Sequence, residues 1–409
     1  MKIFKFLAVA LVAMLGFTAC DKDCDHDFIE HDFTQDIVGT WTTLNGELAE
    51  AMVIKADGSF TTTGVMKGGS LYEEKGTIKV VNNKVSLAFD GDKETFEGRL
   101  EFVAGKSLSL VMFDDNDVRL TYDYCNEDLS EEIVGMWVYN DVKEAMRIHT
   151  FDNNGSATFT GWSEYLGEFS VLENSNYRVV GDLVFQGFSN EEDSFTKYIA
   201  AKLIYAPNGT AYGDIMTFKS YSSDGTESVQ SWLRVKQHLN LTNKVYAYKS
   251  AYISNVKGKD EDFSIMGYPF NIAKIKTSDF DVMFGSDLLL AEFPNSNTMK
   301  HRFHINGQDA GFDATIAVKD NKVTIDMSVV NPALRKVDMY MFQDKDDTQL
   351  HMYMPTASFI NYFANMELYA LILEGKIDSA DTAAVEKVFA DMAARIESIN
   401  VSFVFKALK

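Results

Sequence analysis

Short segments of alternating apolar and polar residues, separated by turn residues, repeat along most of the chain. Residues 52–55 and 60–63 flank the turn Asp57-Gly58, and a second pair of segments flanks Asn154-Gly155. Asn and Gly adopt the positive φ angles that tight hairpins need, so both pairs predict β-hairpins. Further segments follow at roughly ten-residue spacing, which is typical of all-β folds. The pattern predicts a mainly β chain of antiparallel strands, closed into barrels or stacked as sandwiches.

A helical period is found only after about residue 356, where apolar residues recur at spacings of three and four. It predicts helices at about 356–374, stopped by Gly375, and at about 381–397, capped by Asp381. This hairpin precedes a final strand at 400–407. It either covers or plugs the mouth of a barrel, or packs on the outer wall as a structural insertion. The candidate lid residues over an apolar cavity are Phe359, Phe363, Met366, Tyr369, Phe389 and Met392.

An internal repeat divides the chain. Residues 33–41 and 129–137 match, with Ile, Val, Gly and Trp at the same positions. A third copy at 241–245 lacks the Gly and the Trp, but residues 315–323 and 77–85 are identical at six of nine positions. Duplication at domain-sized spacing predicts three related barrels. We expect them at 33–126, 127–238 and 239–409, the last with the helices inserted.

The repeat opens each of the first two units with Gly-x-Trp, at Gly39 and Trp41 and again at Gly135 and Trp137. This motif resembles the signature of lipocalin-like (calycin) barrels, and small lipocalin-like domains repeated in lipoproteins of Gram-negative bacteria fit best. The resemblance implies that an Arg on the last strand covers the Trp at the closed end. The residues in that place are Arg119 and Arg234. An indole face attracts a guanidinium, which gives the pairing a physical reason.

The N-terminus has the features of an export signal. Two Lys precede an uncharged stretch from Phe6 to Phe17, and small residues follow, so residues 1–19 are expected to be removed. Phe17-Thr18-Ala19-Cys20 resembles the lipobox of bacterial lipoproteins, with Phe in place of the usual Leu. The resemblance implies lipidation of Cys20 and a membrane anchor. Residues 20–32 then form an acidic tether, a feature of surface-exported lipoproteins, although Asp after the Cys is also associated with inner-membrane retention.

Charge and motif content exclude several classes of function. The chain carries 38 Lys and Arg against 60 Asp and Glu, a net charge of −22, which repels nucleic acid. None of the spaced motifs of hydrolases, zinc proteases or phosphate loops is present. His301 and His304 would face opposite sides of a strand and do not predict a zinc site. We expect no metal and no cofactor. Pairing of Cys24 with Cys125 stays open.

The sequence therefore predicts a lipid-anchored, non-enzymatic protein of the outer membrane or cell surface. Our first hypothesis is that the third domain binds a small apolar or amphiphilic ligand. The alternative is an accessory subunit for protein interaction or glycan handling, whose outer surfaces matter and which has no ligand cavity. Neither the ligand nor an envelope protein partner can be identified from these residues.

Overall fold

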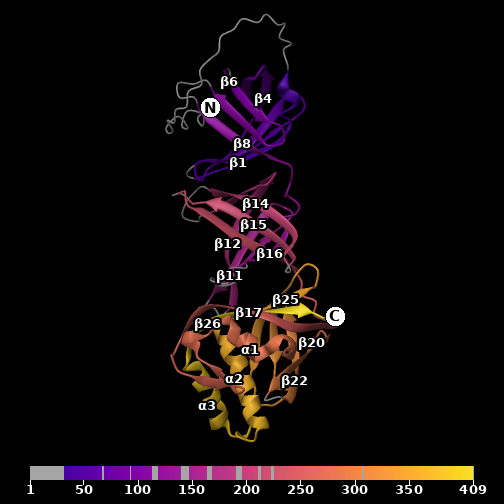
Figure 1. Ribbon diagram of the computed structural model, residues 1–409, viewed down its shortest axis with the longest axis vertical. Coiled ribbons are helices and arrows are strands. Elements are labelled where there is room, and N and C mark those ends of the chain that lie inside the picture. Colours follow the sequence, from indigo (N-terminus) through magenta and orange to yellow (C-terminus); the bar gives the residue numbers. More distant parts are fainter. Residues whose placement is uncertain are drawn as a thin grey trace, which may run out of the picture. The chain divides into compact units, whose positions relative to one another are not determined.

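Three antiparallel barrels of eight strands each follow one another along the chain (Figure 1). The computed structural model describes residues 32–66, 69–92, 94–112, 118–139, 147–163, 168–189, 196–210, 213–222, 225–305 and 308–408. The prediction of a mainly β fold with tandem barrels is confirmed, and the sandwich alternative is excluded because each sheet closes on itself. Among the described residues, no helix is long and apolar enough to span a bilayer.

Barrel 1 pairs its strands in chain order and closes between its first and last strands, where Trp41 lies opposite Tyr124. Its interior is apolar because alternate strand residues point inward, as Ile78 and Val80 do on either side of the exposed Lys79. A short 3-10 helix, η1 (Phe33–Gln35), precedes the strands. The strands are β1 (Gly39–Leu44), β2 (Ala49–Ile54), β3 (Ser59–Val65), β4 (Leu71–Val81), β5 (Lys84–Phe89), β6 (Thr95–Val103), β7 (Ser107–Met112) and β8 (Arg119–Cys125).

Barrel 2 repeats this order and closes between β9 and β16, where Trp137 lies opposite Arg234. Its strands are β9 (Gly135–Tyr139), β10 (Arg147–Phe151), β11 (Ser156–Ser163), β12 (Glu168–Val180), β13 (Leu183–Ser189), β14 (Thr196–Thr210), β15 (Gly213–Tyr221) and β16 (Glu227–Val235).

Barrel 3 closes between β17 and β26, and a two-stranded sheet of β18 and β19 is inserted after β17. A second 3-10 helix, η2 (Ile272–Lys274), follows that sheet. The strands are β17 (Lys244–Gly258), β18 (Phe263–Ile265), β19 (Tyr268–Phe270), β20 (Leu290–Asn295), β21 (Thr298–Ile305), β22 (Gln308–Lys319), β23 (Lys322–Asp326), β24 (Lys336–Gln343), β25 (Gln349–Met354) and β26 (Ile396–Ala407).

All three described α-helices belong to barrel 3: α1 (Thr277–Leu288), α2 (Thr356–Leu373) and α3 (Thr382–Ala393). The expectation that no helix precedes residue 356 is wrong for α1, which is short and interrupted by Gly285, so its apolar period is weak. The second predicted helix also ends earlier than 397. Ala394 is its C-cap, and Ile396 already begins β26.

By compactness the chain forms two units, whose limits differ from those of the three barrels. Unit 1 contains the described residues up to Ile133 together with Ser175–Ile204 and Phe218–Val229. Unit 2 contains Val134–Asn174, Tyr205–Thr217 and the chain from Gln230 onward. The strands of barrel 2 are thus shared between the two units, and each unit has apolar clusters of its own.

Candidate functional site

The buried Trp of barrel 2 lies under a guanidinium. Trp137 is fully buried, and the Cζ atom of Arg234 lies 4.7 Å from the centroid of its ring. Arg234 also donates to the Val134 carbonyl oxygen at 3.2 Å and lies 3.7 Å from the buried carboxylate of Asp214. Gly135, two residues before the Trp, has a φ of 133°, a conformation that L side chains rarely adopt.

The equivalent Trp of barrel 1 has a different neighbour. Trp41 meets the ring of Tyr124 edge to face at 5.0 Å between centroids. Arg119 does not cover it: that side chain is 53% exposed and forms an ion pair with Glu101 at 2.7 Å. The expectation for Arg119 is wrong because it lies at the start of β8, whereas the register places Tyr124 opposite Trp41. A Cβ at Gly39 would lie 2.7 Å from Tyr124 Cε2, so this close approach requires Gly.

The helical hairpin contacts strands on two sides of barrel 3. Helix α2 packs against β24, β25 and β26. On the other side, Tyr362 Oη lies 3.2 Å from Nδ1 of His301 on β21, and Tyr369 Oη donates to the Gly311 carbonyl oxygen on β22 at 3.4 Å. The helix therefore covers the barrel interior instead of lying on its outer wall.

The candidate lid residues take part in the core of barrel 3. Phe359, Phe363, Met366, Phe389 and Met392 are buried, and Tyr369 is half-buried. Phe359 and Phe363 lie within ring contact of Phe280 on α1, which in turn meets Phe403 on β26 at 5.3 Å. The same apolar cluster contains ten described methionines, which are Met266, Met283, Met299, Met327, Met339, Met341, Met352, Met354, Met366 and Met392.

One carboxyl group is buried inside barrel 1. Glu50 on β2 accepts hydrogen bonds from the hydroxyls of Tyr72 on β4 and Tyr122 on β8. Burial raises the pKa of Glu50 above its ordinary value, and the two hydrogen bonds lower it by less. Burial also raises the pKa of the half-buried Glu74 on β4, which faces the same interior. The apolar core of barrel 1 thus contains a small cluster of polar side chains. Among the described residues, no Lys or Arg forms an ion pair with the Glu50 carboxyl group at its centre.

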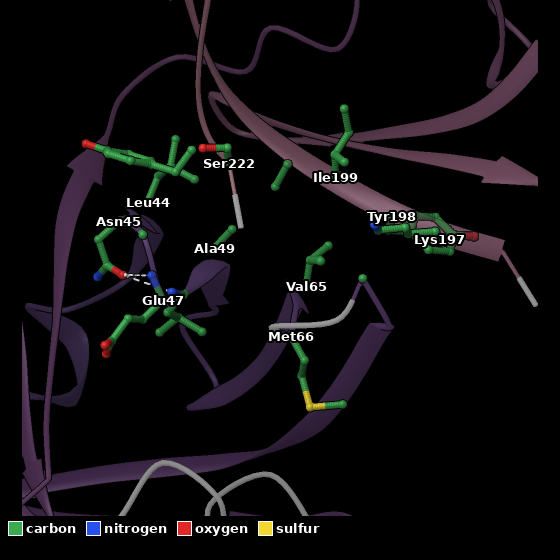
Figure 2. A pocket seen from close by; sticks show the side chains of 15 residues that line it. Leu44, Asn45, Glu47, Ala49, Val65, Met66, Lys197, Tyr198, Ile199 and Ser222 are labelled. Carbon is green, nitrogen blue, oxygen red and sulfur yellow. Dashed lines mark hydrogen bonds between the residues drawn. The ribbon is translucent and has the colours of Figure 1, made fainter. Parts of the chain in front are cut away.

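A cleft opens on the outer surface of unit 1, and Figure 2 shows it from close by. We define the cleft by the β1–β2 turn, the end of β3, the start of β14 and the end of β15. Its volume is about 230 Å³. Apolar residues line much of it, and Glu47 and Lys197 stand on opposite sides (Figure 2). The lining residues are Leu44, Asn45, Gly46, Glu47, Leu48, Ala49, Val65, Met66, Gly69, Lys197, Tyr198, Ile199, Ala200, Tyr221 and Ser222.

Three of the described histidines are buried. Burial lowers the pKa of His149 and of His301 to about 3 and that of His351 to about 4, so all three are neutral at pH 7. Within the described ranges, no three His, Cys, Asp or Glu side chains gather closely enough to hold a metal ion. Cys125 is buried, and its thiol donates to the Glu127 carbonyl oxygen at 3.0 Å. Cys20 and Cys24 lie outside the described residues.

A polar link that no sequence pattern predicts joins barrels 2 and 3 inside unit 2. Lys345, in the β24–β25 turn, forms an ion pair with Asp214 at 3.0 Å. Lys236, directly after β16, forms an ion pair with Asp347 at 2.6 Å, and its backbone N–H donates to the Gln343 carbonyl oxygen at 2.8 Å. Residues 344–347 form an acidic turn, a composition typical of exposed turns, yet Asp344 is fully buried. Only the partners, which are distant in sequence, distinguish this turn from an exposed one.

Comparison with known proteins adds little to this picture. No protein-family model matches the chain, and no curated protein matches it. A solved structure that resembles it is that of isotype 1 transferrin binding protein B (TbpB) from serogroup B Neisseria meningitidis, with 8% sequence identity and a TM-score of 0.22. The match covers 89% of this chain and 66% of that one, so the chain spans slightly less than two thirds of that protein. A likeness this weak supports no conclusion about function.

Proposed function

We propose that this chain is a lipid-anchored envelope protein of the lipocalin-like repeat type, which acts by binding and not by catalysis. The export signal at residues 1–19, the lipobox-like Cys20 and the acidic tether support this address. Lipid chains on Cys20 hold an otherwise water-exposed protein at the outer membrane or cell surface.

Replacing the anchoring residue tests the address. In Cys20→Ser, no thiol remains for lipidation, so the protein is expected to move from the membrane fraction to the soluble fraction of the envelope. Cys24→Ser is the matched control, because it removes a neighbouring thiol and leaves the anchor. If both variants stay with the membrane, lipidation of Cys20 is not the anchor. If both become soluble, Cys20 has no special role.

The best-supported ligand is a small apolar or amphiphilic molecule in barrel 3. The observation that carries this proposal is the composition of the core, where ten methionines and several Phe rings from the strands and from α1, α2 and α3 belong to one apolar cluster. Methionine is unbranched and polarisable, so a core rich in it adapts its packing to different apolar shapes. Barrels 1 and 2 then serve as spacers that hold barrel 3 away from the anchor.

Helices α2 and α3 form the lid in this proposal, and Arg335 is its latch. The Arg335 guanidinium lies 3.8 Å from the Phe389 ring centroid and 2.7 Å from the Glu386 carboxylate, both on α3. The Arg335 backbone is held in turn by the Asn365 side chain of α2. The ion pair is solvent-exposed, so its contribution is about 1 kcal/mol or less. The binding free energy of a ligand that enters the core offsets the small free energy lost when this ion pair opens.

The test is the ligand content of the purified full-length protein. The protein is isolated from bacterial envelopes in mild detergent. Its bound apolar molecules are extracted with organic solvent and quantified by mass spectrometry. Native mass spectra of the intact protein show whether the same mass is bound to it. We expect a discrete molecule at near-stoichiometric amount. Met366→Trp, which fills interior volume without adding charge, is expected to reduce it at least fivefold. Val318→Trp on β22, at a residue 40% exposed, is the matched control and leaves the content unchanged.

Equal and low content in all three proteins would contradict ligand binding in barrel 3. The alternative function, an accessory subunit for protein interaction or glycan handling, would then be favoured. The observation that supports this alternative is the cleft on the outer surface of unit 1, which lies outside the barrel interiors.

A further inference from the structure

We propose that the cleft of unit 1 is a docking site for an extended segment of a partner protein, which inserts one bulky apolar side chain between a basic residue and an acidic residue. This site is separate from the barrel 3 interior, and the inference goes beyond the proposed ligand. It rests on the size of the cleft, its lining, its two charged sides and its rigid construction.

The size of the cleft favours a single side chain. Its volume is about 230 Å³, whereas pockets for drug-sized molecules run from about 300 to 1,000 Å³. One aromatic or long aliphatic side chain fills a space of this size. Pockets that receive a single buried anchor residue are typical of the energetic centre of protein interfaces.

The lining favours an apolar anchor over a sugar. Leu44, Ala49 and Val65 on the barrel 1 side face Tyr198 and Ala200 on the barrel 2 side. Val65 is a buried member of one apolar cluster, and Leu44, Tyr198 and Ala200 pack against it. A sugar ring requires several hydrogen-bonding groups in the cavity, and the side-chain oxygen of Asn45 is already engaged within the β1–β2 turn.

Asn45 lines the cleft, and its side-chain oxygen is already engaged. It accepts hydrogen bonds from the backbone N–H groups of Glu47 at 2.9 Å and Leu48 at 2.8 Å, which fix the β1–β2 turn. This oxygen therefore shapes the cleft and contributes less to recognition. An apolar side chain does not need this oxygen as a partner, whereas a polyhydroxyl ligand does.

Opposite charges on the two sides of the cleft determine which charges the bound segment carries and in which direction it lies. Glu47 stands on the β1–β2 turn and Lys197 on β14, both are exposed, and neither forms an ion pair with another described residue. They lie on opposite sides of the cleft in Figure 2, so an extended segment that crosses it meets both. The complementary segment carries a basic residue on the Glu47 side and an acidic residue on the Lys197 side.

The two walls of the cleft are fixed to each other, so the site is formed before the partner arrives. The backbone N–H of Tyr198 donates to the Gly69 carbonyl oxygen at 2.7 Å. Gly69 has a φ of 85°, and a Cβ there would lie 2.5 Å from Lys197 Cγ, so the close approach requires Gly. Arg178 forms an ion pair with Glu73, which lowers the pKa of that carboxyl. A preorganised site loses less entropy on binding.

The test uses the full chain and a panel of capped pentapeptides, with binding measured by NMR titration. The reference probe has the sequence Lys-Gly-Phe-Gly-Asp, acetylated and amidated. Exchange of its Phe for Ala is expected to weaken binding at least about tenfold, because the anchor supplies most of the binding energy. Ala200→Phe fills the cleft and abolishes binding of the Phe peptide. The matched control is Ala88→Phe, on the half-exposed outer face of β5, which leaves binding unchanged.

Charge variants test the polarity independently of the anchor. Lys197→Glu is expected to shift the preference from the mixed-charge peptide to Lys-Gly-Phe-Gly-Lys by about two- to fivefold, the scale of exposed ion pairs. Glu47→Lys shifts it equally toward Asp-Gly-Phe-Gly-Asp. The proposal is overturned if no peptide binds, if the Phe and Ala peptides bind equally, or if Ala88→Phe weakens binding as much as Ala200→Phe. Free phenylalanine that binds as tightly as the capped peptide would also overturn it, in favour of a small zwitterion.

Discussion

Barrels 1 and 2 close around a buried Trp in the same register, yet they cover the indole with different residues. The cross-strand partner of Trp41 is Tyr124, and that of Trp137 is Arg234. In both barrels a Gly with positive φ lies two residues before the Trp. The glycine conformation and the pairing of first with last strand are therefore shared by both copies, and the residue that covers the Trp is what differs.

The difference shows what a charged cover requires. A Tyr ring needs only apolar neighbours to pack edge to face on an indole. A guanidinium at the same place needs an acid, and Asp214 supplies it while also accepting from Tyr205 Oη at 2.7 Å. Lys345 then shares the same carboxylate. Barrel 2 thus has a polar network beside its Trp, where barrel 1 has an aromatic pair.

Removal of the indoles is expected to have the largest effect. Trp41→Ala and Trp137→Ala each delete a fully buried ring, which costs about 3–5 kcal/mol in the free energy of unfolding. The loss is expected to be greater for Trp137→Ala, because Arg234 also loses the ring face that covers it. Denaturant unfolding followed by circular dichroism measures both. A larger loss in Trp41→Ala would contradict the greater dependence of the charged closure on its Trp.

An exchange of covers tests the chemistry directly. Arg234→Tyr leaves Asp214 with Lys345 as its remaining cation, so we expect a loss of about 2–3 kcal/mol, at or below the range for broken buried pairs. Tyr124→Arg places a guanidinium over Trp41 without an acid and is expected to cost a similar amount. Unfolding midpoints in urea check both. If Tyr124→Arg leaves the free energy of unfolding unchanged, a guanidinium can cover the Trp without an acidic partner.

The two glycines separate backbone strain from steric contact. Gly39→Ala and Gly135→Ala share an unfavourable positive φ, a strain of about 1–3 kcal/mol. Only the Cβ at Gly39 meets a ring at 2.7 Å, whereas that at Gly135 finds its nearest atom, Arg234 Nε, at 4.0 Å. We expect Gly39→Ala to lose about 1 kcal/mol more than Gly135→Ala, again by urea unfolding. Equal losses would mean that Tyr124 moves aside freely.

The interiors of the two barrels are expected to respond to pH in opposite directions. The folded pKa of Glu50 is raised above 4.5, so the folded state holds the proton longer, and stability falls as pH rises above 4.5. The folded pKa of His149 is about 3 against 6.5, so stability falls as pH drops from 6.5 toward 3. Each slope is at most about 1.4 kcal/mol per pH unit.

Glu50→Gln and His149→Phe are the variants that separate these slopes. The first is expected to flatten the stability profile above pH 4.5, and the second to flatten it between pH 3 and 6.5. Urea unfolding at a series of pH values measures the profiles. If Glu50→Gln flattens the acid side instead, the direction of the Glu50 shift is wrong.

The smallest effect is expected at Arg119, which the sequence motif placed over Trp41. Its ion pair with Glu101 is exposed on both partners, so Arg119→Ala is expected to change the free energy of unfolding by about 0.5 kcal/mol or less. Arg234→Ala is the matched comparison and is expected to cost several times more. A large loss in Arg119→Ala would show that it contributes to the closure of barrel 1 after all.

The parts of the fold that follow from local pattern could be predicted from the sequence. Alternating strands, the two Gly-x-Trp motifs and the long helical stripe of α2 each lie within one short segment, so their residues are read together. Helix α1 has too short and interrupted a period to be recognised. The motif predicted Arg on the last strand, but only the pairing register decides which residue of β8 meets Trp41.

The candidate sites depend on residues that are far apart in the chain. Glu50, Tyr72 and Tyr122 come from three strands of barrel 1, and the cleft combines two barrels of the repeat. Lys345 and Asp214 are separated by 131 residues. No spacing rule connects such positions, because the connection exists only once the barrels are folded and packed.

The apolar wall of barrel 2 that faces β24 and β25 within unit 2 has a consequence for the order of biosynthesis. Val138, Ile148 and Leu233 are buried there against Tyr340 and Phe342. A chain that emerges from its N-terminus completes all strands of barrel 2 about a hundred residues before this cover is made. During export that wall stays uncovered, so a product that stops near residue 238 has a complete second barrel and still needs a chaperone to remain in solution.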